Sequence, residues 1–433
     1  MRVAIVGSGI AGLGSAWLLS KAGAAVTVYE ANDYLGGHTH TVDVTLEGIT
    51  APVDTGFLVF NDRTYPHLVA LFGELGVASV PSPMSFSVSV ERAGVEWAGT
   101  DVASLFAQPR NTLRPAFWRM LADILRFNRA TTALLREDRV RPVTLGEYLA
   151  VEGYSGPFRD WYLLPMAAAI WSAPTRDILE FPLMTFLRFC SNHGLLQIFD
   201  RPQWRTVRGG AREYVARIAS RLRDVRIATP VLGVRRLARG GGVEIATAGR
   251  LERYDEVVLA CHSDQAQALL ADPSPAETAL LTGVRYQPNR VVLHTDAALL
   301  PRSRRAWSAW NYFTADDAAG RRPAAVSYLI NKLQPLPFRT PVIVTLNPPR
   351  EPAAATVLQE FEYSHPLLDG HALQAQAGFA ALQGVRHTWY AGAWLGHGFH
   401  EDGLRAAHAV AAGLLRRARP APVSSAQAPR IAA

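Results

Sequence analysis

Residues 2–12, Arg2-Val3-Ala4-Ile5-Val6-Gly7-Ser8-Gly9-Ile10-Ala11-Gly12, decide the fold. The apolar run predicts a buried parallel strand, and the three glycines form the Gly-x-Gly-x-x-Gly pattern that leads into a helix. Gly7 allows the tight turn, Gly9 lets a pyrophosphate approach the backbone, and Gly12 lets the helix lie close to the strand. Phosphates are expected at the helix N-terminus, beside Ile10 and Ala11, where unpaired N–H groups point outward.

A second predicted strand, residues 26–29, ends on Glu30, eighteen residues beyond Gly12. A carboxylate at this position accepts hydrogen bonds from ribose hydroxyls, and it repels a 2′-phosphate, so NADP is disfavoured. Strand, glycines, helix, strand and acid occur in register, which indicates a dinucleotide-binding βαβ unit. Gly36 and Gly37 then form a second glycine pair, a feature that plain nicotinamide dehydrogenases do not need, placed to return the backbone towards the same nucleotide.

Composition sets broad limits on function. The chain has 433 residues, 49% of them hydrophobic and 19% charged, which is ordinary for a globular enzyme of two domains. Its two cysteines, Cys190 and Cys261, have neither disulfide-framework nor metal-site spacing, and no metal site is expected. These features fit a reducing cytoplasm. No run approaches the roughly 18 to 20 apolar residues that a membrane span needs.

The net charge of +7 comes almost entirely from arginine, because Lys21 and Lys332 are the only lysines. A basic surface favours anionic partners such as lipid headgroups. No nucleic-acid-binding motif accompanies this charge, so nucleic acid is not expected as a partner. The sequence does not predict the oligomeric state.

The chain divides into segments of different character. Residues 1–83, 201–270 and 385–418 are predicted to form one discontinuous nucleotide-binding domain of α/β type. Residues 84–200 and 271–384 are predicted to form an α+β substrate domain. The Pro-rich tail, 419–433, is predicted to be disordered.

One helical stretch, residues 110–141, combines apolar side chains at helical spacing with many arginines. A helix of this kind can lie on an anionic membrane surface, or it can simply pack its apolar face on the core. Core packing is the simpler interpretation, and peripheral membrane contact stays open. The apolar block at 161–171 is expected to form core or to wall a hydrophobic substrate channel.

The C-terminal region again combines a strand, a glycine-rich turn and the N-terminus of a helix. A strand at 388–394 leads through a glycine-rich turn into a helix predicted to run from Leu404 to about Arg417. The N-terminus of such a helix stabilises negative charge on a bound group.

Taken in order, the elements at 3–39, 206–215, 254–262 and 388–413 resemble the FAD-dependent amine oxidase and phytoene desaturase superfamily over essentially the whole chain. More narrowly, Asp54-Thr55-Gly56-Phe57, Trp310-Asn311-Tyr312 and the stretch 390–403 are similar to a bacterial subgroup of predicted NAD/FAD-binding proteins. Members of that subgroup are associated with enzymes that modify unsaturated acyl chains. The resemblance implies a Rossmann-like FAD domain and a substrate domain of the amine oxidase type.

The resemblance also implies which residues bind FAD. The pyrophosphate, ribose, ribityl, adenine and isoalloxazine contacts would come from Gly7, Gly9, Ile10, Ala11, Gly12, Glu30, Ala31, Gly36, Gly37, His38, Thr39, Val231, Gly392, Asp402, Gly403 and Leu404. The sequence departs from the superfamily's FAD-binding pattern at two positions. His38 stands where many members have arginine, and Ala393 stands where many have an acidic residue.

A flavin accepts a hydride from a C–H bond, so the protein need only orient that bond and exclude water. The proposed proton-transfer groups are His38, His397, His400 and Glu401, with His40 beside them, although such histidines also often cap backbone groups. Three roles stay open: a desaturase, dehydrogenase or isomerase acting on lipid acyl chains, an amine oxidase, or a flavin-binding partner protein without turnover. The poor match of Lys332 to the lysine of amine oxidases disfavours the second role.

Overall fold

The computed structural model describes residues 1–137, 142–197, 202–314 and 324–418, so the predicted tail at 419–433 lies outside the described residues. A five-stranded parallel sheet organises the nucleotide-binding domain, in the order β10-β2-β1-β14-β20. Its strands are β1 (Arg2–Val6), β2 (Ala25–Tyr29), β10 (Asp224–Arg226), β14 (Glu256–Leu259) and β20 (Thr388–Tyr390). The central strand β1 is buried from Val3 to Val6, as a parallel strand covered on both faces must be.

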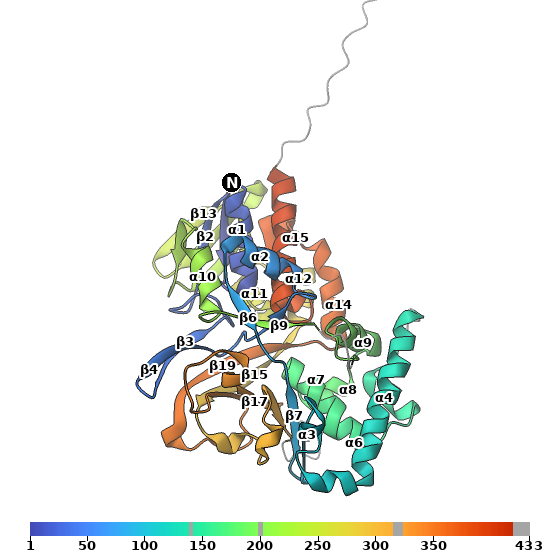
Figure 1. The fold of residues 1–433 in the computed structure, drawn as a ribbon. Helices are drawn as coiled ribbons and strands as arrows, with labels where there is room; N and C mark the ends of the chain where they lie inside the picture. The colour runs from blue at the N-terminus through green and yellow to red at the C-terminus, as the bar shows by residue number, and fades with distance from the viewer. Residues whose placement is uncertain (138–141, 198–201, 315–323, 419–433) are drawn as a thin grey trace, which may run out of the picture.

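Helices cover this sheet. On one face, α1 (Ile10–Lys21) and α15 (His400–Ala418) share an apolar cluster with β1, and α2 (Pro66–Leu75) and α10 (Arg212–Ala219) pack against these two helices. Figure 1 shows α1 and α15 side by side, although they come from opposite ends of the chain. The predicted βαβ unit and the return of the C-terminus to it are both confirmed.

A second sheet of seven strands organises the other domain, in the order β19-β15-β18-β17-β16-β7-β8. The strands are β7 (Phe86–Val90), β8 (Val95–Ala98), β15 (Arg285–His294), β16 (Trp310–Phe313), β17 (Ala325–Leu329), β18 (Ile343–Leu346) and β19 (Val357–Leu367). Only the β16–β7 pair is parallel; the other pairs are antiparallel. This mixed sheet joins two segments that are far apart in the sequence, as the α+β prediction requires.

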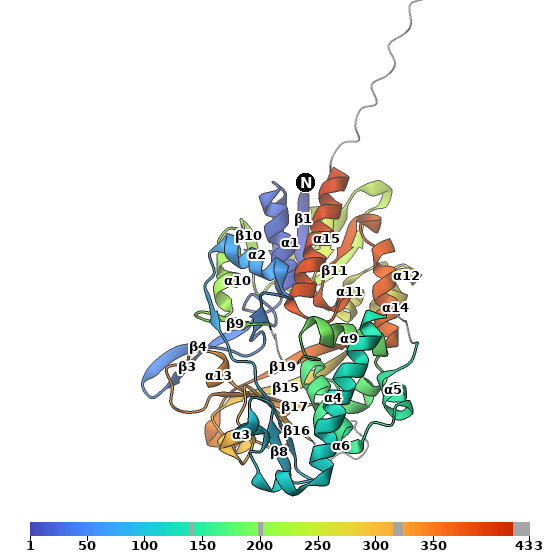
Figure 2. The same cartoon turned by 45° about the vertical axis from the view of Figure 1, so that its right-hand side comes forward.

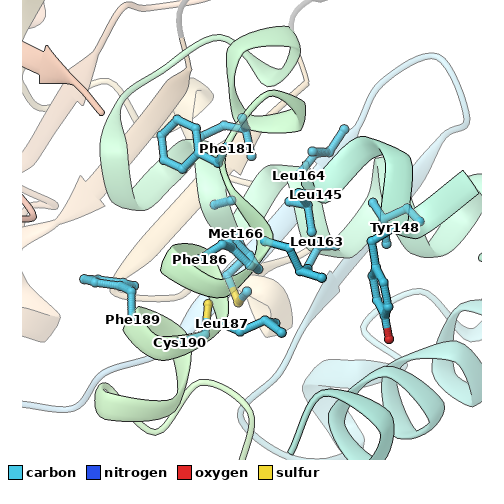
Figure 3. Close-up of a cluster of buried hydrophobic side chains, with 14 of the residues drawn as sticks. Leu145, Tyr148, Leu163, Leu164, Met166, Phe181, Phe186, Leu187, Phe189 and Cys190 are labelled. Atoms are coloured by element: carbon cyan, nitrogen blue, oxygen red, sulfur yellow. The ribbon is translucent and has the colours of Figure 1, made fainter. Parts of the chain in front are cut away.

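A helical lobe packs beside this sheet (Figure 2). Its helices are α3 (Val102–Leu105), α4 (Pro115–Arg136), α5 (Leu145–Val151), α6 (Gly156–Phe158), α7 (Leu164–Trp171), α8 (Thr175–Leu179) and α9 (Leu183–Asn192). Figure 3 shows buried side chains of α5, α7, α9 and the adjoining segments meeting in one apolar cluster, which includes Leu163, Phe186 and Leu187 with no exposed surface. The apolar block at 161–171 is therefore part of a core, the first of its two expected roles.

Smaller elements connect these units. They are β3 (Thr41–Leu46), β4 (Ile49–Asp54), β5 (Phe60–Asn61), β6 (Ser79–Pro81), β9 (Trp204–Val207), β11 (Val231–Arg236), β12 (Val243–Thr247), β13 (Arg250–Tyr254), α11 (Ser263–Leu269), α12 (Pro275–Thr282), α13 (Ile330–Leu333) and α14 (Gly370–Gly378). Leu281 of α12 and Ala372 of α14 share a core cluster with Val257 of β14. The exact domain boundaries stay a prediction. Across the four described ranges, no helix has the length and apolar character needed to cross a membrane.

Candidate functional site

The first glycine turn has two glycines that the fold requires and one that it does not. Gly7 has φ +102°, and a Cβ there would lie 2.9 Å from the Ala260 carbonyl oxygen. A Cβ on Gly12 would lie 2.0 Å from the Gly7 carbonyl oxygen, so α1 can approach β1 only with glycine. A Cβ on Gly9 would meet no protein atom within 4 Å. The space beside Gly9 therefore suits a group that must come close to the backbone, as a pyrophosphate does.

The N-terminus of α1 faces the same space. Gly9 is its N-cap residue, no side chain forms a cap hydrogen bond, and the first turn contains no acidic residue. The N–H groups of the first turn, from Ile10 onward, are left for a bound anion, whose charge the helix dipole also stabilises. The predicted phosphate-binding residues Ile10 and Ala11 are therefore well placed for FAD.

Glu30 joins the two glycine turns. Its buried carboxylate accepts hydrogen bonds from Ser8 N (3.0 Å), Ser8 Oγ (2.5 Å) and Asn32 N (2.9 Å). Ser8 Oγ in turn accepts from Gly36 N at 3.1 Å. An ionised carboxylate has about four acceptor positions, so one is left for a ribose hydroxyl. Ala31, the next predicted contact, is exposed at the start of the following loop.

The second glycine pair closes against the first turn. Gly36 and Gly37 have φ of +113° and +57°, values that favour glycine. A Cβ on Gly37 would lie 3.3 Å from the Gly9 Cα, so the two turns are in direct contact. Thr39, two residues further on, hydrogen-bonds through Oγ1 to His400 Nε2 at 2.9 Å. The backbone therefore returns to the first glycine turn, as predicted, while its contact with the nucleotide stays a prediction.

The C-terminal helix reaches this site with its first turn. A Cβ on Gly403 would lie 2.7 Å from Ile10 Cγ2, and Leu404 Cδ2 lies 2.7 Å from the Cβ position of Gly14. The predicted helix start at Leu404 is wrong, because α15 begins at His400. The Asp402 carboxylate accepts from Phe399 N at 3.0 Å and thereby caps the extra turn.

Two further predicted cofactor residues lie in the surrounding strands and turns. Gly392 precedes a short turn whose Trp394 Nε1 donates to the Cys261 carbonyl oxygen at 3.1 Å, so this turn is fixed to the end of β14. Val231 opens β11 and belongs to the core cluster that contains Val6 and Tyr29. Their contacts with the isoalloxazine end and with the adenine stay predictions.

A cluster of aromatic and imidazole rings surrounds His38. The ring centroids of Tyr363, His365 and His262 lie 5.1, 5.3 and 6.0 Å from that of His38. His38 Nε2 is buried and has no hydrogen-bond partner in the described part of the chain. Burial and the neighbouring imidazoles hold the pKa of His38 well below its ordinary value, and burial lowers the pKa of His365 to about 4. The rings are therefore neutral at pH 7, and His38 Nε2 is left for a bound group.

The other predicted histidines occupy different surroundings. The His400 ring stacks on Phe57 with centroids 3.7 Å apart, and burial lowers the pKa of His400 to about 3. His397 is half-buried, 5.6 Å between ring centroids from Phe189 of the helical lobe, and burial lowers its pKa. His40 Nδ1 hydrogen-bonds to Tyr363 OH at 3.0 Å. Thr39 thus links His400 to the second glycine turn, whereas His397 faces the lobe.

Glu401 is committed to a structural contact. Its carboxylate accepts from His67 N at 3.0 Å and Leu68 N at 3.1 Å, and so caps the N-terminus of α2. His67 Nδ1 also lies 2.5 Å from Glu401 Oε1. Its assignment to proton transfer stays a prediction, with no oxygen of the carboxylate left unbonded.

Sequence reasoning missed the partners of His38. His262 follows β14, and its place after a buried strand was a usable signal. Tyr363 and His365 lie on β19, in the other domain, and only the pairing of β19 with β15 brings them here. Asp54 was recognised in the sequence only as part of a family motif. It is fully buried, burial raises its pKa to about 7, and it accepts from Ala211 N (2.9 Å) and Gln334 Nε2 (2.8 Å).

Comparison with known proteins also indicates a flavin-binding protein. A family model described as flavin containing amine oxidoreductase matches residues 10–329. Among curated proteins, the chain is 30% identical to a carotenoid phi-ring synthase of Streptomyces griseus over 298 residues, 62% of this chain and 54% of that protein. It is 44% identical to a 1-hydroxycarotenoid 3,4-desaturase of Flavobacterium sp. (strain P99-3) over 68 residues, 16% of this chain and 12% of that protein. The match thus spans about half of the first relative and a short part of the second.

Solved structures share the whole fold. Cyclohexylamine oxidase from Brevibacterium oxydans IH-35A superposes with a TM-score of 0.67 at 21% identity, over 96% of this chain and 99% of that one. A CLA-producing fatty acid isomerase from P. acnes superposes with a TM-score of 0.65 at 16% identity, over 96% and 98%. At these identities the likeness establishes the fold alone.

Proposed function

Because the chain belongs to the family of flavin-containing amine oxidoreductases, we propose that it acts as an FAD-dependent desaturase, dehydrogenase or isomerase on an unsaturated acyl chain of a lipid. The coarser statement, an FAD-dependent oxidoreductase of the amine oxidase superfamily, follows from family membership and from the fold. The choice of an apolar substrate depends on the charge and polarity of the residues around the predicted cofactor site.

FAD, when bound, supplies the acceptor for a hydride taken from a C–H bond. The residues described above would hold it: Gly9 and the N-terminus of α1 at the pyrophosphate, and Glu30 at the ribose. What the rest of the chain must do is position the reacting bond and keep water away from it.

One observation carries the choice of an apolar substrate: the buried histidines and carboxylates beside the second glycine turn present no free charge. The imidazoles of His38, His365 and His400 are neutral, because burial lowers the pKa of each. The nearby carboxylates of Asp54 and Asp402 are engaged by donors of the chain itself. A charged substrate group would find no counter-ion among these residues, whereas a hydrocarbon needs none.

The helical lobe supports the same choice. Phe189, at the margin of the apolar cluster in Figure 3, stacks on Phe399 with ring centroids 5.1 Å apart. Phe399 directly precedes α15, so the lobe and the cofactor-binding helix meet through aromatic rings. A wall of this kind can accept an extended hydrocarbon. The names of the carotenoid relatives and of the fatty acid isomerase also favour an unsaturated chain.

The test is an anaerobic titration of the FAD-loaded protein with phospholipids carrying unsaturated acyl chains. We expect the visible absorbance of the flavin to bleach, or, for a redox-neutral isomerisation, the lipid product to change without net bleaching. Mass spectrometry of the extracted lipid separates a loss of two hydrogens from a shifted double bond. Saturated phospholipid is the matched control. A flavin that neither bleaches nor changes any lipid would overturn the proposal.

A second candidate, amine oxidation, is favoured by one cavity. This cavity of about 470 Å³ lies between the 31–40 loop and β19, and is lined by Asp33, Tyr34, His40, Gln359, Phe361, Glu362 and Tyr363. Two carboxylates beside aromatic rings can bind an ammonium group. Bleaching by amines but not by lipids, lost in Glu362→Gln, would make amine oxidation the function.

A further inference from the structure

We propose that the outer face of α4 is a docking surface for a membrane that carries anionic lipid headgroups. The inference goes beyond the proposed function, and it depends on the surface of α4 rather than on the substrate. Figures 1 and 2 show α4 along the outside of the helical lobe. We use the name α4 face for its exposed side chains together with Leu113, which lies just before the helix.

Large apolar side chains on the α4 face are open to solvent. Leu113 is 85% exposed, Leu125 54% and Trp118 51%. Single exposed apolar residues are ordinary on a protein surface, but these three occur within thirteen residues of one another. The opposite side of the helix is packed conventionally, since Phe117, Met120 and Phe127 have no exposed surface. The helix therefore buries one apolar side in the lobe and presents a second apolar group outward.

The charge on α4 is almost entirely positive. The helix contains four arginines, Arg119, Arg126, Arg129 and Arg136, against a single acid, Asp123. Asp123 is buried and pairs with Arg126, so it does not oppose the surface charge. Of the ion pairs in the described part of the chain, none involves Arg119, Arg129 or Arg136. These three guanidinium groups are available to an external anion.

A hollow beside α4 is lined by both apolar and basic side chains. It has a volume of about 610 Å³ and is lined by Leu125, Asn128, Arg129, Thr132, Ala133, Arg136, Glu137 and Leu196. Two of its arginines stand beside leucine side chains, the arrangement that suits a phosphate group joined to hydrocarbon.

An anionic bilayer is the occupant that uses all of these features. Interfacial helices insert Trp and Leu side chains at the boundary between headgroups and acyl chains, while arginines bind the lipid phosphates. A purely polyanionic partner such as nucleic acid would use the arginines but would leave Leu113, Trp118 and Leu125 in water. Membrane contact through α4 would also bring the helical lobe to the source of a lipid substrate.

The experiment is flotation of the FAD-loaded full-length protein with vesicles. Vesicles of phosphatidylcholine are compared with vesicles of equal parts phosphatidylcholine and phosphatidylglycerol. We expect binding to the anionic vesicles only, weakened by salt, and weakened about fivefold for each arginine removed in Arg129→Gln and Arg136→Gln. Leu113→Ser with Leu125→Ser should also weaken it. No flavin reaction is scored, so the result is separate from the outcome for the proposed function.

The matched controls lie on β13 of the nucleotide-binding domain, where Leu251 is 62% exposed and Arg250 is exposed. Arg250→Gln and Leu251→Ser should leave vesicle binding unchanged. All these side chains are at the surface, so each variant should fold, which equal FAD content and thermal midpoints would verify. Failure to bind anionic vesicles, equal loss in the control variants, or binding of heparin through the arginines with no dependence on Leu113 and Leu125 would overturn the proposal.

Discussion

Replacing Gly9 by alanine should weaken the binding of FAD and leave the fold intact. Gly9 has φ −62° and ψ 178°, a backbone conformation that alanine adopts freely. The new methyl group would meet no protein atom within 4 Å. It would instead occupy the space in which the pyrophosphate has to approach the backbone. The matched variant is Gly12→Ala, whose methyl group would lie 2.0 Å from the Gly7 carbonyl oxygen.

The two variants differ in which free energy they change. In Gly9→Ala, loss of a good N-cap residue destabilises the folded protein by about 0.5–1 kcal/mol. The alanine also lowers the conformational entropy of the unfolded chain, which stabilises the folded protein by about 0.4–1 kcal/mol. The apoprotein should therefore be nearly as stable as the wild type. The misplaced methyl group should weaken FAD binding by about 1–3 kcal/mol, which is roughly 5- to 150-fold in Kd. For Gly12→Ala, backbone atoms must move, so folding itself should lose about 1–3 kcal/mol or more.

The assay has two readouts. FAD is removed from each protein, the thermal midpoint of the apoprotein is recorded, and FAD is then titrated back while the quenching of its fluorescence is followed. Gly9→Ala should show an unchanged apoprotein midpoint with weakened FAD binding, and Gly12→Ala a lowered midpoint. A Gly9→Ala protein that binds FAD with wild-type affinity would refute the placement of the pyrophosphate.

Three other changes test neighbouring groups. Glu401→Gln should lower stability by about 1 kcal/mol, because it weakens the cap on α2, and should leave FAD affinity unchanged; lost turnover at unchanged stability would instead support the predicted proton-transfer role. His38→Phe should weaken FAD binding because it removes Nε2, which has no partner among the described residues, and should lower apoprotein stability by about 1 kcal/mol because it also removes the ring's hydrogen bond to the Ser364 backbone; equal FAD affinity in both proteins would count against a cofactor contact. Acidification should destabilise the protein between pH 6.5 and about 4. Burial holds the pKa of His365 at about 4 and that of His400 at about 3, below the pKa of a histidine in the unfolded chain. In this pH range the unfolded state therefore binds more protons than the folded state. Urea unfolding should show a fall of up to about 1.4 kcal/mol per pH unit for each histidine, and His400→Gln should flatten that dependence.

The glycine turns could be predicted because the spacing of Gly7, Gly9 and Gly12 and the pair Gly36-Gly37 are visible in the sequence. The atoms that leave no room for a side chain, such as the Ala260 carbonyl oxygen beside Gly7, lie far away along the chain. The start of α15 could not be predicted so well. The glycine-rich stretch before Leu404 reads as a turn, but its last residues are helical, with bonds from Gly403 N to the Phe399 carbonyl oxygen and from Phe399 N to the Asp402 carboxylate.

Contacts between distant segments are beyond a reading of one sequence. Glu401 looks like a free acid beside a cofactor turn, yet its partner His67 lies 334 positions away. Tyr363 and His365 carry no local sign of function, because their meeting with His38 depends on the register of β19 against β15 and on how the two domains pack.

The missed contacts change the chemistry that the site can perform. With Glu401 used as a helix cap and the imidazoles held neutral by burial, these side chains bring no free charge to the second glycine turn. The redox step then depends on FAD, and the choice of substrate depends on the shape and polarity of the surrounding walls. We therefore expect substrate selectivity to be determined where the helical lobe meets α15, at Phe189 and Phe399, because this junction joins the apolar cluster to the helix predicted to contact the cofactor. Phe189→Ala would shorten this wall and enlarge the space beside it. The variant should therefore accept acyl chains of different length, with little change in FAD affinity. Measuring the product distribution and the FAD Kd in parallel separates the two effects.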